Sequence, residues 1–246
     1  MQAIILAAGL GKRLKEYTKD NPKCMVTVNG VSMIERLLRQ LDDKKLERII
    51  IVTGYEEEKL RTFVGSLGIN TPVEFVDNPI YDKTNNIYSL ALAKDKMLED
   101  DTLLFESDLM FDDAVIERIA ADNRSAVAVV AKYEEWMDGT CVTIGQDELI
   151  TRFIPKKDQI AADKDTYYKT VNVYRFSRKF AERFYIPFMD AYRHAMGENE
   201  YYEQVLRIIT VIDDPVVGAL VLDKEKWYEI DNAEDLQNAA RLFTVH

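Results

Sequence analysis

The sequence predicts an α/β protein built on one doubly wound, mainly parallel sheet, with a small β/helical lid subregion towards the C-terminus. Three observations support this fold class. Short apolar runs alternate with helical segments through the first half, a glycine-rich turn follows the first run, and closely spaced strand-like segments replace this alternation in the second half. Strands that alternate with helices form βαβ units with parallel strands and right-handed crossovers.

The strands of the first half are predicted from continuous apolar runs, because a strand covered on both faces has no polar side. These strands are residues 3–6, 49–52, 73–76, 102–105 and 126–131. Between them, apolar side chains recur at helical spacing, as at Ile34, Leu37, Leu38 and Leu41. The predicted helices are residues 32–41, 56–64, 86–97 and 115–121.

The second half is predicted as hairpin strands followed by helices. The expected strands are residues 141–144, 149–154, 168–176, 216–222 and 227–230, and the expected helices are residues 178–195, 201–209 and a last one that begins near Asn232. No repeat, low-complexity tract or Pro/Gly linker interrupts the chain. We therefore expect residues 1–246 to form a single domain with a Rossmann-like sheet, whose lid covers the strand ends where open α/β sheets bind ligands.

Composition limits the partners that the protein can have. The formal net charge of −11 argues against non-specific binding to nucleic acid or to an anionic membrane surface, which need basic surface. Cys24 and Cys141 lie far apart and outside any CxxC spacing, which favours a reducing cytoplasm. No apolar stretch approaches the roughly 18 residues of a membrane span, and the N-terminal run is too short for a signal peptide. We expect a cytoplasmic protein.

The strongest local signal is the segment LAAGLGKRL, residues 6–14, directly after the first predicted strand. Gly9 and Gly11 allow the backbone to approach a phosphate, and Lys12 and Arg13 add positive charge. The segment matches neither the Walker A pattern nor GxGxxG. Two glycines alone would support an ordinary strand-to-helix turn equally well.

The continuation decides between these interpretations. AAGLGKRL followed by PKCM, residues 22–25, resembles the signature of the sugar-phosphate nucleotidyltransferase superfamily. The resemblance implies that Gly9, Gly11 and Arg13 cradle a nucleoside triphosphate and that Lys23 offsets charge on its α-phosphate. The expected nucleotide-binding segment contains Leu6, Ala7, Ala8, Gly9, Gly11 and Lys12. The alternative for Lys23 is a solvated lysine beside a turn proline. The resemblance also divides the domain into a nucleotide-binding half, about residues 1–131, and an acceptor and lid half, about residues 132–246.

One departure from the signature favours a particular branch. RLKEYT, residues 13–18, and NNIYSL, residues 85–90, resemble the bacterial choline-phosphate cytidylyltransferases more than the sugar-handling enzymes. The side chains of Asn85, Asn86 and Ser89 could pair with the edge of cytosine. An asparagine here could equally cap a helix.

Two aspartates are the expected metal ligands. Asp108 follows the fourth predicted strand, and Asp231 lies between a strand and a helix in WYEIDNAEDL. The resemblance implies that both bind Mg²⁺, which favours carboxylate oxygens. A helix N-cap is an equally good interpretation of Asp231 taken alone.

The acceptor site is predicted from aromatic and basic residues of the second half, namely Tyr133, Trp136, Tyr201, Trp227 and Lys169. Aromatic faces attract quaternary ammonium groups, and Trp136 and Trp227 are the best candidates. Aromatic residues at such spacings are usually part of the core. Lys169 could bind the acceptor phosphate, whereas Lys156 and Lys157 resemble a solvated surface run.

Together these features predict a Mg²⁺-dependent cytidylyltransferase that transfers CMP from CTP to a small phosphorylated amino alcohol and releases pyrophosphate. Phosphocholine is the first expected acceptor. The alternatives are 2-aminoethylphosphonate or phosphoethanolamine, then a sugar or polyol 1-phosphate, and from another class a non-catalytic nucleotide-binding regulatory module. Fusion to, or association with, a pathway enzyme is left open, and the sequence predicts no oligomeric state.

Overall fold

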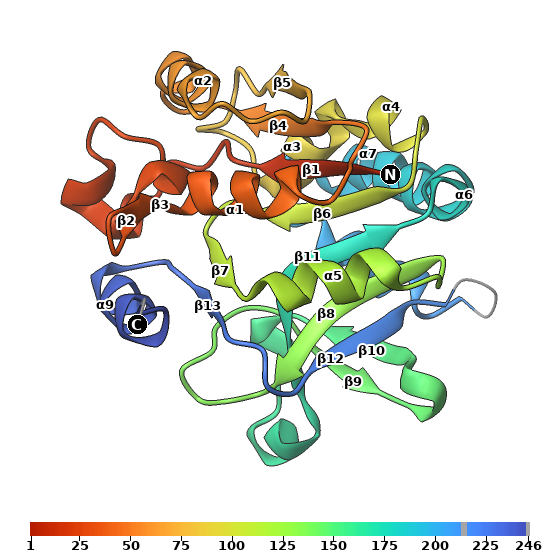
Figure 1. The fold of residues 1–246 in the computed structure, drawn as a ribbon. Helices are drawn as coiled ribbons and strands as arrows, with labels where there is room; N and C mark the ends of the chain where they lie inside the picture. The colour runs from red at the N-terminus through yellow and green to blue at the C-terminus, as the bar shows by residue number, and fades with distance from the viewer. Residues whose placement is uncertain (213–215, 245–246) are drawn as a thin grey trace.

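The computed structural model describes residues 1–212 and 216–244 (Figure 1). One large sheet has the strand order β10-β9-β11-β6-β1-β4-β5. Outside this order, β11 also pairs with β8, and β8 pairs with β12. Its strands are β1 Gln2–Leu6, β4 Ile49–Thr53, β5 Val73–Asp77, β6 Thr102–Glu106, β8 Ala126–Lys132, β9 Cys141–Ile144, β10 Ile150–Ile154, β11 Tyr168–Phe176 and β12 Gly218–Leu222.

Strands β6, β1, β4 and β5 are parallel, as expected. β1 lies between β4 and β6, with Ala3 opposite Ile49 and Leu103. All five residues of β1 are buried, and alternate side chains enter different core clusters, Ala3 and Ile5 on one face and Ile4 on the other. This two-sided burial explains the continuous apolar run, and it confirms the doubly wound, mainly parallel fold.

Helices cover both faces of the sheet. α1 (Met33–Asp42), α2 (Glu57–Ser66) and α5 (Asp113–Ala121) pack on one face. The other face is covered by α3 (Asn86–Leu92), α4 (Lys94–Met97), α6 (Arg178–Phe180), α7 (Ile186–Met196) and α8 (Glu203–Ile209). None of the helices in the described ranges is long and apolar enough to cross a membrane.

Strand β11 joins the two halves of the molecule. Its first residues pair with β9, Lys169 lying opposite Cys141, and its last four pair with β6. The pairing with β8 shifts register between Thr170 and Tyr174, and Asn172 has a φ of 59° inside this irregularity. The C-terminal strands therefore extend the central sheet, and the bend of β11 brings polar side chains towards the strand ends.

Two small sheets complete the fold. β2 (Thr27–Val28) and β3 (Val31–Ser32) form a hairpin, and β7 (Leu109–Phe111) pairs with β13 (Trp227–Glu229). The second pairing places the segment before α9 (Ala233–Leu242) beside the residues that follow β6. The single helix expected at 86–97 is divided into α3 and α4 at Ala93, and a π-helical turn at Ala181–Tyr185 interrupts the helix expected at 178–195.

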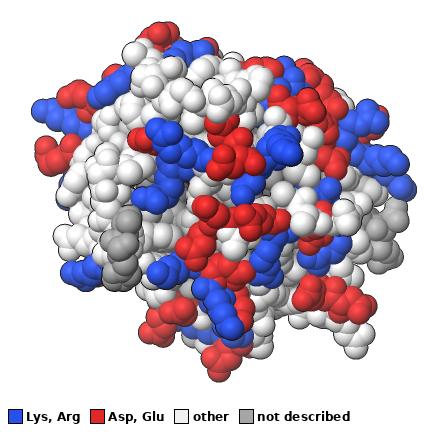
Figure 2. Space-filling model, viewed as in Figure 1, with Lys and Arg blue, Asp and Glu red and all other residues white. Residues whose placement is uncertain are grey.

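The surface carries both signs of charge. Figure 2 shows Lys and Arg interspersed with Asp and Glu on the face that carries α1 and α5.

Candidate active site

A cleft of about 920 Å³ opens at the carboxyl ends of β1 and β6. This is the edge at which open α/β sheets bind ligands. Most of the residues predicted from the sequence line it: Leu6, Ala8, Gly9, Gly11, Lys12, Arg13, Lys23, Asn85, Asn86, Ser89, Asp108, Lys169, Tyr201 and Asp231. Ala7 does not, because its side chain lies in the core, while its N–H donates to the carbonyl of Val52.

The glycine loop is fixed against Lys23. Gly11 has a φ of 62° and precedes the 3₁₀ helix Lys12–Thr18. A Cβ added at Gly11 would lie 2.9 Å from Cβ of Lys23 and 2.9 Å from Cγ2 of Thr18, so both the conformation and the space require glycine. Around Gly9, by contrast, a Cβ would meet no described atom within 4 Å. The loop is therefore packed on one side and open to the cleft on the other.

Lys23 lies at the centre of an ion-pair cluster. Its Nζ is 2.5 Å from Oδ2 of Asp108 and 2.8 Å from Oδ1 of Asp231, and Arg13 reaches the same Oδ1 at 2.6 Å. Burial alone would lower the pKa of Lys23, but the two carboxylates outweigh it and raise the pKa above its usual range. Lys23 is thus a fixed positive charge, and the interpretation as a solvated lysine is wrong.

Asp231 does not cap the last helix. The N-cap of α9 is Asn232, whose side chain accepts from the N–H groups of Glu234 and Asp235 in a capping box. This leaves the carboxylate of Asp231 free to face Lys23 and Arg13.

The carboxylates fit a divalent cation. Oxygens of Asp108, Glu229 and Asp231 lie within 4.8 Å of one another. Oδ1 of Asp108 is buried and has no hydrogen-bond partner among the described residues. A buried carboxylate oxygen without a donor is costly unless something else satisfies it, and Mg²⁺ prefers such oxygens. The donor set therefore fits the expected ion, with Glu229 as a third candidate ligand.

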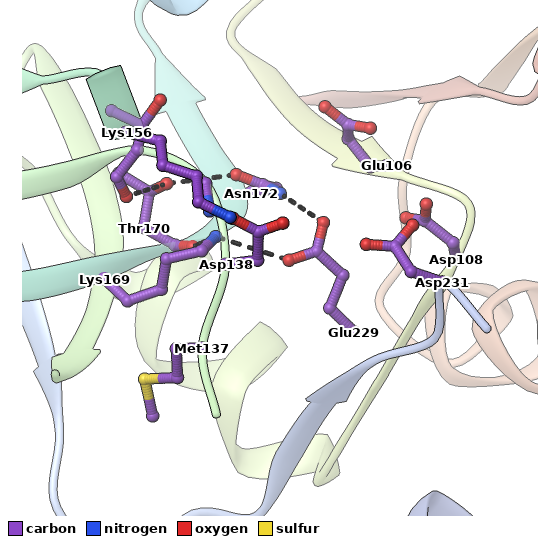
Figure 3. A network of polar contacts seen from close by, with 12 residues as sticks. Glu106, Asp108, Met137, Asp138, Lys156, Lys169, Thr170, Asn172, Glu229 and Asp231 are labelled. Atoms are coloured by element: carbon purple, nitrogen blue, oxygen red, sulfur yellow. Dashed lines mark hydrogen bonds and ion pairs between the residues drawn. The ribbon is translucent and has the colours of Figure 1, made fainter. Parts of the chain in front are cut away.

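A buried polar network on the acceptor side was only partly anticipated (Figure 3). Lys169, only 1 % exposed, lies 3.3 Å from Oε2 of Glu229, and Asn172 donates to Oε1 of the same carboxylate. Thr170 donates to Asn172, and its hydroxyl also lies 3.3 Å from Oε1 of Glu203. Of these residues, Lys169 was predicted from the sequence as a site residue, whereas Asn172 and Glu229 were not.

Burial shifts the pKa values of these acidic groups upwards. It raises the pKa of Glu229 to about 7, with Lys169 opposing the shift and Asp108 and Asp231 adding to it. Burial likewise raises the pKa of Glu203, although Lys169 lowers it. The pKa of Glu106 is raised by burial and by the nearby Asp108. A site with this excess of carboxylates would gain from bound cations.

The residues expected to contact the base have structural partners. Asn86 donates to Oε1 of Glu106 and accepts from the N–H of Tyr202, and Asn85 caps α3. Ser89 is buried and accepts from Asn78, which was not predicted. These side chains line the cleft, yet in this arrangement they also hold α3 against β6 and α8.

Three aromatic predictions require correction. Trp136 and Trp227 line a separate pocket of about 600 Å³, not the cleft, and Tyr133 lies against the apolar core. Trp227 is buried because its large apolar surface packs into the core, and the ring of Trp136 packs on it. Of the predicted aromatic residues only Tyr201 reaches the cleft, where Tyr81 also lies.

A glycine loop and a buried lysine between two carboxylates, at the edge of a doubly wound sheet, are groups that can position and neutralise the phosphates of a nucleotide. The comparisons agree. The chain matches the MobA-like NTP transferase domain over residues 3–221, and it belongs to this family.

Several relatives are cytidylyltransferases. The CMP-5′-(3-aminopropyl)phosphonate synthase of Streptomyces rubellomurinus is 27% identical over 97% of this chain and 38% of its own length. The 2-aminoethylphosphonate cytidylyltransferase of Lancefieldella rimae is 39% identical over 45% of this chain and 44% of its own. The chain thus spans less than half the length of these two relatives. A solved CTP:phosphocholine cytidylyltransferase from Streptococcus pneumoniae superposes with a TM-score of 0.81 at 25% identity, covering 99% of both chains.

Proposed function

We propose that the protein transfers CMP from CTP to a small phosphonate or phosphate that carries a primary amine, and releases pyrophosphate. The observation that carries this proposal is the position of Lys23, held between Asp108 and Asp231 directly beside the glycine loop. Transfer of a cytidylyl group is the activity to which the names of the three relatives described above point.

The chemistry needs no covalent enzyme intermediate. An oxygen of the acceptor attacks the α-phosphorus of CTP in line, the new O–P bond forms, and the bond between the α-phosphorus and the bridging oxygen to the β-phosphate breaks. Lys23 and Arg13 stabilise negative charge on the α-phosphate and on the departing pyrophosphate, and N–H groups around Gly9 and Gly11 position the phosphates. Mg²⁺ held by Asp108 and Asp231, with Glu229 as a further candidate, would neutralise phosphate charge.

The acceptor proposal differs from the first expectation. The expectation of phosphocholine rested on the resemblance of RLKEYT and NNIYSL and on an aromatic box of Trp136 and Trp227. The two tryptophan rings lie on the other pocket. The cleft instead presents carboxylates near Lys169, among them Glu203 and Asp138. A primary ammonium has three N–H donors that need such acceptors, whereas a trimethylammonium group has none. The acceptors named in two relatives, 3-aminopropylphosphonate and 2-aminoethylphosphonate, are primary amines.

The test measures pyrophosphate release with each common NTP, with and without EDTA, and with four acceptors: 2-aminoethylphosphonate, phosphoethanolamine, phosphocholine and a sugar 1-phosphate. We expect CTP and Mg²⁺ to be required and the primary amines to be preferred at least tenfold. Equal turnover with all NTPs contradicts cytidylyl specificity, and absence of turnover with every pair supports a regulatory module. A preference for phosphocholine or for the sugar phosphate rejects the amine assignment alone.

Glu203→Gln isolates the ammonium contact. The loss of one charged contact should raise the KM for 2-aminoethylphosphonate about ten- to hundredfold while the KM for CTP changes little. The matched control is Glu200→Gln, because Glu200 belongs to the same segment but accepts from Tyr192. Equal effects of the two substitutions would remove Glu203 from the acceptor site.

A further inference from the structure

The loop between β8 and β9, residues 133–140, separates the two pockets of the molecule. Asp138 and Gly139 line the catalytic cleft, whereas Glu134, Trp136 and Met137 line the second pocket together with β13. One short loop therefore has its polar side in the cleft and its aromatic side against a different surface.

The aromatic side is anchored by Trp136. Its ring stacks on Tyr228 with centroids 4.5 Å apart and an interplanar angle of 6°, and lies 5.5 Å from the ring of Trp227. Nε1 of Trp136 donates to Glu134 within the same loop. The side chain is nevertheless 43% exposed, so it rests on β13 and is not part of the core. Because it is half exposed, the side chain buries little surface in the core. Its contact with Tyr228 mainly fixes the position of the loop.

The surface beneath Trp136 belongs to the same strand as one of the cleft carboxylates, Glu229. Tyr228 precedes Glu229, and the ring of Trp227 lies 6.0 Å from Nζ of Lys169, which pairs with Glu229. A movement of Trp136 away from β13 would therefore loosen the loop at the point where it adjoins the acceptor-side network.

The polar side of the loop lies close to Lys169. Gly139 has a φ of 103°, and a Cβ there would lie 3.2 Å from Cε of Lys169 and 3.3 Å from its Nζ. Its neighbour Asp138 is paired with Lys156 at 2.7 Å across the cleft mouth. The distance between Asp138 and Lys156 depends on where the loop is held, because both side chains are exposed, Asp138 on the loop and Lys156 at the start of the 3₁₀ helix Lys156–Asp158.

We propose that Trp136 is a positioning residue for the acceptor: by stacking on Tyr228 it holds residues 133–140 so that Asp138 and Gly139 form the acceptor-side wall against Lys169. This role rests on the proposed transfer to a small amine-bearing acceptor. Trp136 touches neither substrate; it acts through the loop. Lys23, held between Asp108 and Asp231, does not depend on it, whereas Arg13 lies near Asp138 of this loop.

The kinetic test compares Trp136→Leu with Trp136→Phe. Leucine removes the flat ring and should raise the KM for 2-aminoethylphosphonate about tenfold, with kcat and the KM for CTP within about twofold of the wild type. Phenylalanine can still stack and should restore the acceptor KM to within about threefold. Leu98→Ala, on the far side of the sheet and 37% exposed, is the matched control for the loss of exposed apolar surface. Equal rises in both KM values with a fall in Tm, or an unchanged acceptor KM, would overturn the proposal.

A double-mutant cycle tests the contact itself. Tyr228→Leu should raise the acceptor KM as Trp136→Leu does, and the double variant should show no further rise, because both substitutions remove one interaction. The chain has two tryptophans and both lie at this contact, so acrylamide quenching of tryptophan emission reports its opening and should increase in Tyr228→Leu. Additive KM effects or unchanged quenching contradict the positioning role.

Calorimetric binding of 2-aminoethylphosphonate in the presence of CMP separates this inference from the proposed function. A wild type that binds the acceptor without turnover contradicts the proposed reaction only. Equal acceptor affinities of the wild type and Trp136→Leu contradict the positioning role only. A wild type that neither binds nor converts the acceptor contradicts both.

Discussion

Lys23→Ala is the most informative single substitution, because the structure shows two consequences of it. In the wild type the lysine ammonium lies between Asp108 and Asp231, and all three side chains are only 13–14% exposed. Removal of the ammonium leaves two nearly buried carboxylates facing each other. In the reaction, the same substitution removes a charge next to the α-phosphate.

The two consequences differ in size and in their response to Mg²⁺. A buried ion pair that loses one partner typically destabilises a protein by about 3–5 kcal/mol, and we expect a loss near the lower limit in Mg²⁺-free buffer because Arg13 still contacts Asp231. Mg²⁺ should recover part of this stability, since it can bind the carboxylate oxygens that the lysine no longer neutralises. Turnover should not recover, because the loss of one transition-state contact lowers kcat by about 10²–10³.

The assay combines pyrophosphate release at saturating CTP with thermal unfolding over a Mg²⁺ titration. Lys19→Ala, at an exposed lysine of the same segment, is the control and should match the wild type in both. A variant that keeps its kcat and shows only a higher KM for CTP would refute the transition-state role. A Tm that responds to Mg²⁺ no more than that of the wild type would refute the electrostatic account of the cluster.

Three further substitutions test other parts of the site. Asp108→Asn should abolish most Mg²⁺-dependent stabilisation and lower kcat at least about a hundredfold, measured by the same titration and assay; an unchanged Mg²⁺ response removes Asp108 as a ligand. Gly11→Ala should lower the free energy of unfolding by about 1–2 kcal/mol, because alanine disfavours the left-handed backbone. It should also lower kcat/KM for CTP, because its Cβ meets Lys23. Denaturant unfolding and kinetics check both effects, and a fully stable, fully active variant contradicts the prediction. Glu229, with a pKa raised to about 7 by burial, binds its proton more tightly in the folded state, so its contribution to stability is complete below pH about 4.5 and is lost as pH rises to 7. In the wild type this loss in the free energy of unfolding between about pH 4.5 and 7 is on the order of 3 kcal/mol. In Mg²⁺-free buffer Glu229→Gln should remove it, and an unchanged dependence of the unfolding free energy on pH would show that another group titrates.

The elements of the fold that were predicted from the sequence are those that the pattern of apolar residues along a short segment determines. The continuous apolar run of β1 reflects a strand that is buried on both faces. The spacing of the apolar residues in α1 reflects a helix that is buried on one face. The approach of Lys23 to Asp108 and Asp231, across 85 and 208 positions, came from the family resemblance, because no local pattern brings such distant residues together. The turn at Asn29 and Gly30, with φ values of 52° and 83°, was predictable from its Asn-Gly dipeptide and was overlooked.

The burial of the site residues depends on tertiary packing and was not predicted. Glu203 stands in a sequence typical of an exposed helix start, and only the packing of α8 beside β11 buries its carboxylate next to Thr170 and Tyr174. The aromatic prediction failed for a different reason, because Trp136 and Trp227 line the second pocket and not the cleft. The sequence placed Trp136 and Trp227 in the predicted acceptor half, but it did not indicate that the ring of Trp136 would pack on Trp227 and Tyr228 of β13, in a pocket separate from the cleft.

The shared strand β11 has a consequence for how the molecule unfolds. Because one uninterrupted strand is paired with β6 at one end and with β9 at the other, neither half can lose its sheet without exposing the edge of the other. Denaturant should therefore produce one cooperative transition, with the slowest amide exchange along β1, β6 and β11. The nucleotide-binding and acceptor-binding surfaces would then share a single global stability, and a substitution that weakens either one lowers the folded population of both.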